Sequence, residues 1–298
     1  MKFSWKRAVC AAASVMLLSS SAAAAESADV SAAQVSTVSA EAVYEQAAQH
    51  MAAHPEGNYV IQMNMNMPFV GSVAAKTTLD MQVDPKFAAQ SQTELNILGK
   101  SYAVQGYAEQ QGNILHLYYG KQDEGAMHWK HREETLKSDA PIGKTAVGKK
   151  RNVMAGVKAV TPAGTGQYKV VFDASRLYTD ADKAEWKQKG LTDQQIAMLS
   201  KVLQALQQAG DVTAVVTIDG QTQRISRVVL PLTPQLRTAV QAAFSLSSLS
   251  EADKAIVSQF VQYSDMSLQI DCRDLPSHTV IAVPDEVRRQ AENSISAH

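Results

Sequence analysis

The residues that could do chemistry near neutral pH begin with three histidines that lie close together, His116, His128 and His131. Imidazoles bind transition metals and exchange protons in this pH range. In an extended strand, the odd spacing of His128 and His131 directs their rings to opposite faces, so these two rings cannot share an ion. His116 and His128 could meet across neighbouring strands, which leaves a metal site open as an alternative. These three rings therefore leave open a hydrolase whose site is assembled across strands.

The other reactive groups lack the partners that catalysis needs. Cys272 and His278 could form a nucleophile pair, but the residues around them supply nothing that would activate the thiol. The acidic clusters at residues 133–134 and 180–182 lie in or beside predicted loops, where exposure to water accounts for them. The chain contains no G-x-S-x-G, P-loop or G-x-G-x-x-G motif. We therefore predict no catalytic residue, no metal ligand, no cofactor and no enzyme activity.

Methionine and aliphatic residues give a stronger pattern. Met63, Met65 and Met67 alternate with polar residues at period two, which is typical of a half-buried strand. Flexible, polarizable methionine side chains adapt to ligands that have no fixed shape. The residues predicted to line the sheet side of an apolar ligand site are Ile61, Met63, Met65, Met67, Leu79, Met81, Leu95 and Ile97. On a predicted covering helix, the lining residues would be Leu199, Val202 and Leu206.

The elements that would position these residues start with a meander. Six segments with strand patterns are joined by short turns such as Gly99-Lys100. An antiparallel meander of this kind has one apolar and one wet face. The predicted strands are residues 61–67, 77–83, 93–97, 102–109, 114–119 and 127–132.

Helices with one apolar face flank and follow these strands. Ser39 is a predicted N-cap for the first helix, which Pro55 stops, and Thr192 with Gln195 forms a capping box for the clearest later helix. The further predicted helices begin near residues 233, 250 and 284, with a short one near 146–155. The further predicted strands are residues 168–172, 212–218, 224–230, 266–270 and 278–283. One α+β domain is the simplest arrangement.

The N-terminus has the composition of a secretory signal peptide. Lys2, Lys6 and Arg7 precede an apolar run of residues 8–18, and Ala23 to Ala25 offer a cleavage site. Cys10 lies near the start of the run, so no lipid attachment is expected. We predict a signal peptide over residues 1–25, a flexible leader over 26–38 and a single domain over 39–298. The protein would be periplasmic or extracellular.

The charge and the cysteine content further limit the class of protein to which this chain can belong. The 28 basic and 29 acidic residues give a formal net charge of -1, and removal of three basic residues with the signal gives 25 minus 29, or -4. A dedicated nucleic-acid binder needs a concentrated basic excess, so no nucleic-acid partner is expected. Only Cys272 of the two cysteines would remain, which excludes an internal disulfide.

A known architecture has this order of elements. On Tyr59 to Met67, Leu117 to Gly120, Met127 to Lys130 and Ile281 to Val287, the chain resembles the LolA-like and LppX-like lipoprotein-carrier superfamily, and within it a family of exported bacterial proteins of unassigned function. The resemblance implies an unclosed antiparallel β half-barrel wrapped around helices, with a hydrophobic cavity for lipid chains. Members of the narrower family commonly carry a lipobox cysteine, which this chain lacks.

The leading hypothesis is an exported, non-enzymatic cell-envelope protein that binds a lipid or another apolar ligand between its sheet and helices. Its partners would be a lipid or hydrophobic small molecule and, transiently, envelope proteins or the membrane surface. The alternative is a protein-interaction or cell-wall-binding module with a filled core. The hydrolase is the third hypothesis.

Overall fold

The structure is a computed structural model, and its described part begins at residue 39. It describes residues 39–298 except 68–70, 124, 137–141, 143–152, 177–182, 185, 188–191, 246–249, 277–278 and 296–298. The predicted signal peptide and leader lie outside the described residues, as does most of the short helix predicted near residues 146–155, whose last residues form a turn at 153–156. The domain boundaries therefore stay a prediction.

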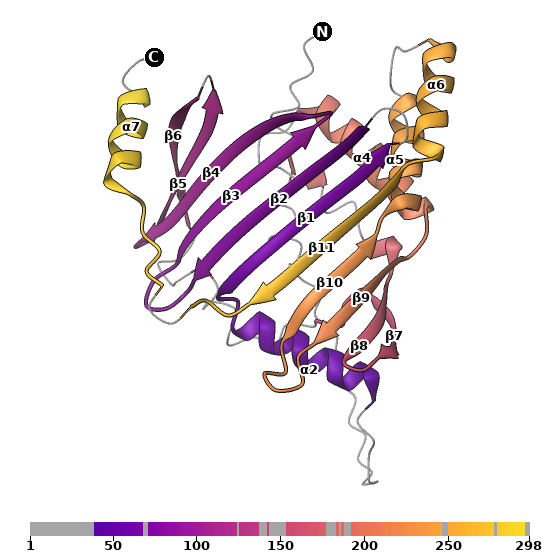
Figure 1. The fold of residues 1–298 in the computed structure, drawn as a ribbon, viewed down its shortest axis with the longest axis horizontal. Helices are drawn as coiled ribbons and strands as arrows, with labels where there is room; N and C mark the ends of the chain where they lie inside the picture. The colour runs from indigo at the N-terminus through magenta and orange to yellow at the C-terminus, as the bar shows by residue number, and fades with distance from the viewer. Residues whose placement is uncertain are drawn as a thin grey trace. The chain divides into compact units, whose positions relative to one another are not determined.

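The described chain is built on one antiparallel sheet of 11 strands in the order β6-β5-β4-β3-β2-β1-β11-β10-β9-β8-β7. β1 to β6 form one meander and β7 to β10 a second, and β11 pairs with β1 on one side and β10 on the other (Figure 1). The sheet is not closed, which confirms the predicted open α+β architecture. The strands are Gly57–Met67, Gly71–Gln82, Ala88–Ile97, Lys100–Gln111, Ile114–Asp123, Ala126–Thr135, Val157–Gly164, Gln167–Phe172, Val212–Ile218, Ile225–Pro231 and Asp265–Arg273.

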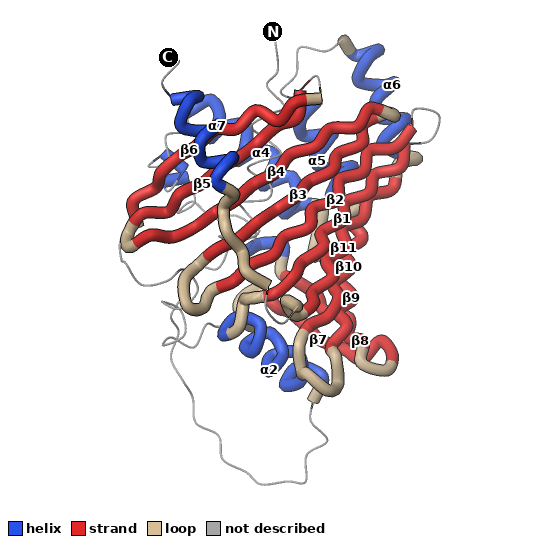
Figure 2. The backbone as a smooth tube through the Cα atoms, turned by 60° about the vertical axis from the view of Figure 1, so that its left-hand side comes forward, coloured by secondary structure: helices blue, strands red, loops and turns tan. Residues whose placement is uncertain are grey.

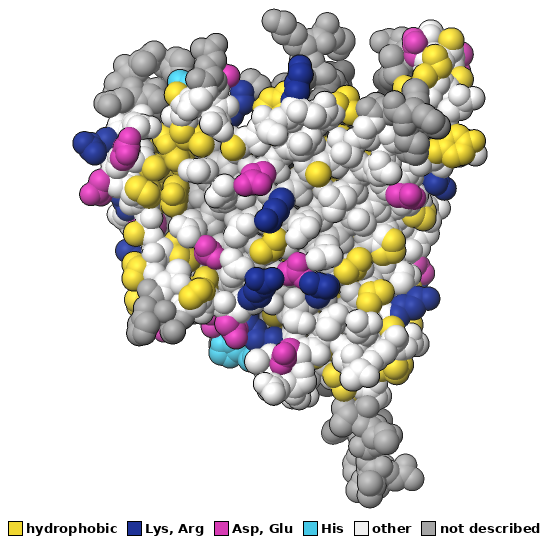
Figure 3. Space-filling model, in the orientation of Figure 1, with side chains coloured by type: hydrophobic (Ala, Val, Ile, Leu, Met, Phe, Trp, Pro, Cys, Tyr) yellow, Lys and Arg dark blue, Asp and Glu magenta, His cyan; other side chains and the backbone are white. Residues whose placement is uncertain are grey.

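The two faces of the sheet differ as the alternation predicts. The apolar face carries Ile61, Met63 and Met65 of β1 together with the residues paired with them across the ladders. The polar face carries the intervening residues, such as Gln62 and Asn64. Figure 3 shows the polar face, over which basic and acidic side chains are scattered singly. The two-residue alternation in the sequence thus separates the side chains of the apolar face from those of the polar face.

Helices lie against both faces. α2 (Ala40–Ala53), capped by the Ser39 side chain, packs on the apolar face of β7 to β10. α7 (Asp285–Ile295) packs on the polar face of β5 and β6. α4 (Asp193–Gln208) contacts α5 (Thr233–Ser245) and the 3-10 helix Ala174–Arg176, α5 also contacts α6 (Glu251–Gln262) and β11, and Figure 2 shows these helices beside the strands. None of the described helices is long and apolar enough to cross a membrane.

Two sequence predictions of strands were wrong. Residues 279–284 form no strand; Ile281 and Val283 are buried, and the segment leads into α7. The alternation was real, but it reflects packing of an unpaired segment. Conversely, Val157–Gly164 forms β7 within a stretch predicted to be irregular, and its register shifts near Ala159 and Pro162 explain the broken pattern.

Candidate functional site

The predicted sheet residues of the ligand site all lie on the apolar face. Met63 pairs with Ala75, and Leu79 pairs with both Tyr59 and Ser91, so the ladders carry one face from β1 to β3. Every one of these predicted residues stays partly exposed to water. The sheet residues that the structure brings together are Ile61, Met63, Met65, Met67, Leu79, Met81, Leu95 and Ile97.

The same surface continues onto β4 and β5, where the sequence analysis named no site residue. Tyr102 is 43% exposed, Val104 is 37% exposed and Tyr119 is 48% exposed. The ladders place Tyr102 beside Leu95, and both Val104 and Tyr119 on the same face. The alternation of residues 102–109 and 114–119 contained the signal that could have found them. We call the apolar face of β1 to β5 the exposed half.

Small residues occupy the middle of the exposed half. Gly106 lies between Ser91 and Tyr119 across the ladders, and a Cβ added at Gly106 would lie only 2.8 Å from the Ser91 hydroxyl oxygen. The hydroxyl groups of Thr77 and Thr93 are hydrogen-bonded to each other at 2.9 Å, so neither needs a ligand. The middle of the exposed half is therefore made of short side chains, and longer apolar side chains lie around it.

The apolar face of β7 to β10, which we call the covered half, has a filled core. Tyr44 and Ala47 of α2 pack there against Val170, Val216 and neighbouring side chains. Val170 is 0% exposed and Val216 is 1% exposed. The two halves share one face of one sheet and differ in what covers them.

The predicted helical lining lies on α4. Leu199 and Leu206 are half-buried there, whereas Ile196, Ser200 and Ala205 are buried. The Val202 side chain lies outside the described part of the structure. The contribution of Leu199, Val202 and Leu206 to a ligand site stays a prediction.

Cys272 is paired with Tyr59 between the two halves and behaves as a structural residue. Burial raises the pKa of the Cys272 thiol to about 11. Burial likewise raises the pKa of Tyr59 to about 12, and its hydroxyl donates a 2.6 Å hydrogen bond to the Pro55 carbonyl oxygen. A thiol that stays protonated at neutral pH is a poor nucleophile. His278, the partner considered for Cys272, lies outside the described residues.

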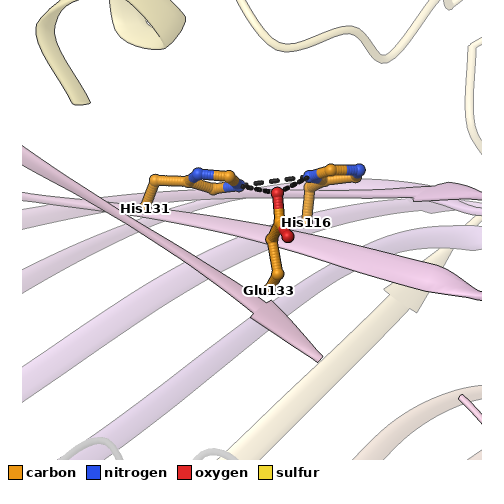
Figure 4. Close-up of side chains that lie close together, drawn as sticks. All are labelled: His116, His131 and Glu133. Atoms are coloured by element: carbon orange, nitrogen blue, oxygen red, sulfur yellow. Dashed lines mark hydrogen bonds and ion pairs between the residues drawn. The ribbon is translucent and has the colours of Figure 1, made fainter. Parts of the chain in front are cut away.

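The histidines meet in a pair that the sequence analysis did not identify. His128 lies opposite Lys121 on the apolar face, so His116 and His128, which could have met across the strands, do not. His116 and His131 share the polar face instead, and His116 Nδ1 lies 3.1 Å from His131 Nε2. Glu133, paired with His116 across the ladder, turns Oε1 toward both rings (Figure 4).

An ion pair fastens α7 close to these rings. The two terminal guanidinium nitrogens of Arg288 donate hydrogen bonds to the carboxylate of Glu109, and the one from Nη2 to Oε2 is 2.7 Å long. Burial alone would raise the pKa of Glu109, but the hydrogen bonds and charge of Arg288 outweigh it and hold the pKa below its ordinary value. Arg288 also lies over the Tyr118 ring, which stacks on His131.

The fold and this surface define a class of protein: an open antiparallel sheet with helices on both faces and part of its apolar face exposed. Among solved structures, the chain is similar to LprF from Mycobacterium bovis, with 11% identity and a TM-score of 0.32 over 82% of this chain and 96% of that one. No family model and no curated protein matches the chain. Membership of the lipoprotein-carrier superfamily stays a prediction.

Proposed function

We propose that the protein is an exported, non-enzymatic cell-envelope protein that binds a lipid or another amphiphile on the exposed half. The observation that supports this is the contrast within one face. Large apolar side chains remain 37% to 48% exposed at Tyr102, Val104 and Tyr119, while those of the covered half are buried. Contiguous exposed apolar surface on a folded protein marks a binding site for an apolar ligand or partner.

Burial of this surface would drive binding. Removing apolar area from water contributes roughly 25 cal/mol per Å², so an acyl chain lying along the strands needs few polar contacts. The flexible methionines of β1 and β2 can adjust to chains of different length. The ligand class that fits is therefore defined by apolar length and not by a fixed shape.

The border of the exposed half favours an anionic head group. On the same side of the sheet, β5 carries Lys121 and β6 carries Lys130 and Arg132. Lys130 is the ladder partner of Tyr119. Arg132 is paired with Glu134 at 3.0 Å and Lys121 lies 3.9 Å from Asp123. Lys130 is exposed and is the natural partner for a carboxylate or phosphate at the end of an acyl chain.

A binding assay with a defined probe tests this function. Purified full-length protein is titrated with a fluorescent long-chain fatty acid, and native mass spectrometry of gently purified protein records any copurified lipid. Val104→Asp places a charge on the exposed half and should abolish binding. The matched control is Ala103→Asp, one residue away on the polar face, which should bind normally.

A second comparison tests the head group. Lys130→Gln should weaken binding of the fatty acid but not of the matching fatty alcohol, whereas Lys76→Gln, exposed on the polar face, should affect neither. Protein that carries no lipid and binds no fatty acid would refute the proposal. Equal losses from Val104→Asp and Ala103→Asp would do so too.

A further inference from the structure

We propose that His116, His131 and Glu133 form a binding site for a divalent transition-metal ion, with Zn²⁺ as the best match to the donors. The site lies on the polar face of the β5–β6 hairpin, opposite to the face that carries the exposed half. It is therefore independent of the proposed lipid site. It also departs from the prediction of no metal ligand, because the sequence alone did not reveal the convergence.

The separations of the donor atoms match those of a tetrahedral ion. His116 Nδ1 lies 3.1 Å from His131 Nε2 and 3.4 Å from Glu133 Oε1. His131 Nε2 lies 3.9 Å from the same oxygen. Ligand bonds of roughly 2.0 to 2.1 Å at tetrahedral angles put neighbouring ligand atoms about 3.3 Å apart. Movements of a few tenths of an ångström would thus bring all three atoms onto one ion.

The backbone presets this arrangement. Residues 131 and 133 are two apart on β6 and so share a face, and His116 is the direct ladder partner of Glu133 on β5. The ring of His131 stacks on Tyr118 with centroids 4.5 Å apart and on His116 with centroids 5.3 Å apart. Paired strands and stacked rings hold both imidazoles, so little ordering is left for the ion to impose.

The donor types select the class of ion. Two imidazole nitrogens and one carboxylate suit Zn²⁺, Co²⁺ or Ni²⁺, whereas Mg²⁺ and Ca²⁺ prefer sites made entirely of oxygen. The side chains of His116 and His131 are 15% and 11% exposed, and that of Glu133 is 55% exposed. Water can therefore reach the cluster beside Glu133 and supply the fourth ligand.

The surrounding charges permit a cation. Arg288 lies 5.8 Å from the Tyr118 ring centroid, but it is paired with the Glu109 carboxylate. Its charge is therefore compensated locally, while Glu133 contributes one negative charge to the ion. Among the histidine, cysteine and acidic side chains of the described residues, His116, His131 and Glu133 form the group of three whose donor atoms lie within 4.8 Å of one another. A bound ion would tie β6, at the edge of the sheet, to β5.

Calorimetric titration of the untagged full-length protein with zinc chloride tests the site. We expect one Zn²⁺ per chain, and with cobalt chloride an intense visible absorption typical of tetrahedral Co²⁺. His131→Ala and His116→Ala should each weaken binding by more than the roughly 10- to 100-fold that loss of an outer-shell partner costs. His128→Ala is the matched control, because it removes a histidine from the opposite face of β6 and should leave affinity unchanged.

Glu133→Gln tests the site in a variant that should still fold, since an exposed glutamate can be replaced without disturbing the sheet. It should keep the circular dichroism spectrum of the wild type and still weaken Zn²⁺ binding at least tenfold. Zinc binding that is absent in the wild type, or unchanged in both Glu133→Gln and His116→Ala, would overturn the proposal. Equal loss in His128→Ala would also overturn it, since the ion would then lie elsewhere.

Discussion

The covered and exposed halves have the same sheet geometry and similar residue types, yet their side chains differ in exposure to water. In the covered half, α2 lies across the strands and leaves Val216 1% exposed. In the exposed half, Val104 faces the same way from its own strand and is 37% exposed. Strand periodicity therefore determines which way a side chain points, while the packing of helices determines whether water reaches it.

This difference separates stability from binding. Residues of the covered half hold the fold, whereas the exposed side chains of the exposed half, Tyr102, Val104 and Tyr119, can change with little cost to folding. Substitutions of the same type in the two halves should therefore have different effects on the free energy of unfolding.

The largest contrast comes from a buried charge. Val216→Asp places an unpaired carboxylate in the core and should lower the free energy of unfolding by about 4 kcal/mol or more. Val104→Asp should change the free energy of unfolding by less than about 1 kcal/mol, because its side chain stays in water. Urea denaturation followed by circular dichroism measures both. Similar losses in the two variants would mean that the exposed half is also core.

A smaller contrast comes from two tyrosines. Tyr44→Ala removes the ring through which α2 packs on the sheet and should cost about 3 kcal/mol. Tyr119→Ala, on the exposed half, should stay within about 0.5 kcal/mol of the wild type. Midpoints of urea unfolding give both values. A stability loss in Tyr119→Ala as large as that in Tyr44→Ala would contradict the assignment.

The third test compares α2 with α7, which lies on the other face. Since the pKa of Glu109 is lowered in the folded protein, its pair with Arg288 stabilises α7 above the ordinary glutamate pKa of about 4.3, and this contribution is lost as the pH falls. Glu109→Gln should cost about 2 kcal/mol, less than the roughly 3 to 5 of a fully buried pair, because the Arg288 side chain is 31% exposed.

Amide hydrogen exchange separates the two helices. At neutral pH, Glu109→Gln should speed exchange in α7 and leave α2 protected. In the wild type, the same change should develop progressively as the pH falls below about 4.3 and be complete only below the lowered pKa of Glu109, once intrinsic rates are corrected. Arg289→Gln is the control, because Arg289 is exposed and next to Arg288. If α2 loosened together with α7, the two helices would not be independent.

The smallest effect should come from the β3–β4 turn and should have the opposite sign. Leu98 and Gly99 form its two central residues with φ values of 50° and 81°, a conformation that favours Asn-Gly. Leu98→Asn should therefore stabilise the protein by about 0.5 to 1 kcal/mol. Leu98 is 51% exposed at the rim of the exposed half, so the same change should weaken fatty-acid binding. Thermal melts and the fatty-acid titration measure these two effects; a less stable variant would contradict the turn assignment.

Much of the sheet could be predicted from the sequence because one face is wet. The alternation of Met63, Met65 and Met67 with asparagines survives in the structure, and so do the hairpins around Gly99 and Gly112. β7 could not be predicted, because Pro162 and Gly164 break the pattern and its ladder contains irregular pairs. The sequence also could not show that α2 covers only one half of the apolar face.

The histidine cluster shows a different limit. The faces of β5 and β6 depend on the register of their hairpin, in which Lys121 pairs with His128 and Tyr118 with His131. With that register, His116 and His131 must share a face. A shift of one residue in this turn would move every side chain to the other face, and the sequence does not fix the register, so the meeting of His116 with His128 stayed open.

The position of β11 has a consequence for the order in which the protein folds. β11 is Asp265–Arg273, near the end of the chain, yet it lies in the middle of the sheet between β1 and β10. The two meanders are local in sequence and can form early, but their union must wait until this late segment has been synthesised. Before that moment, the edges of β1 and β10 are unpaired, and a chain truncated before residue 265 would expose both of them to aggregation.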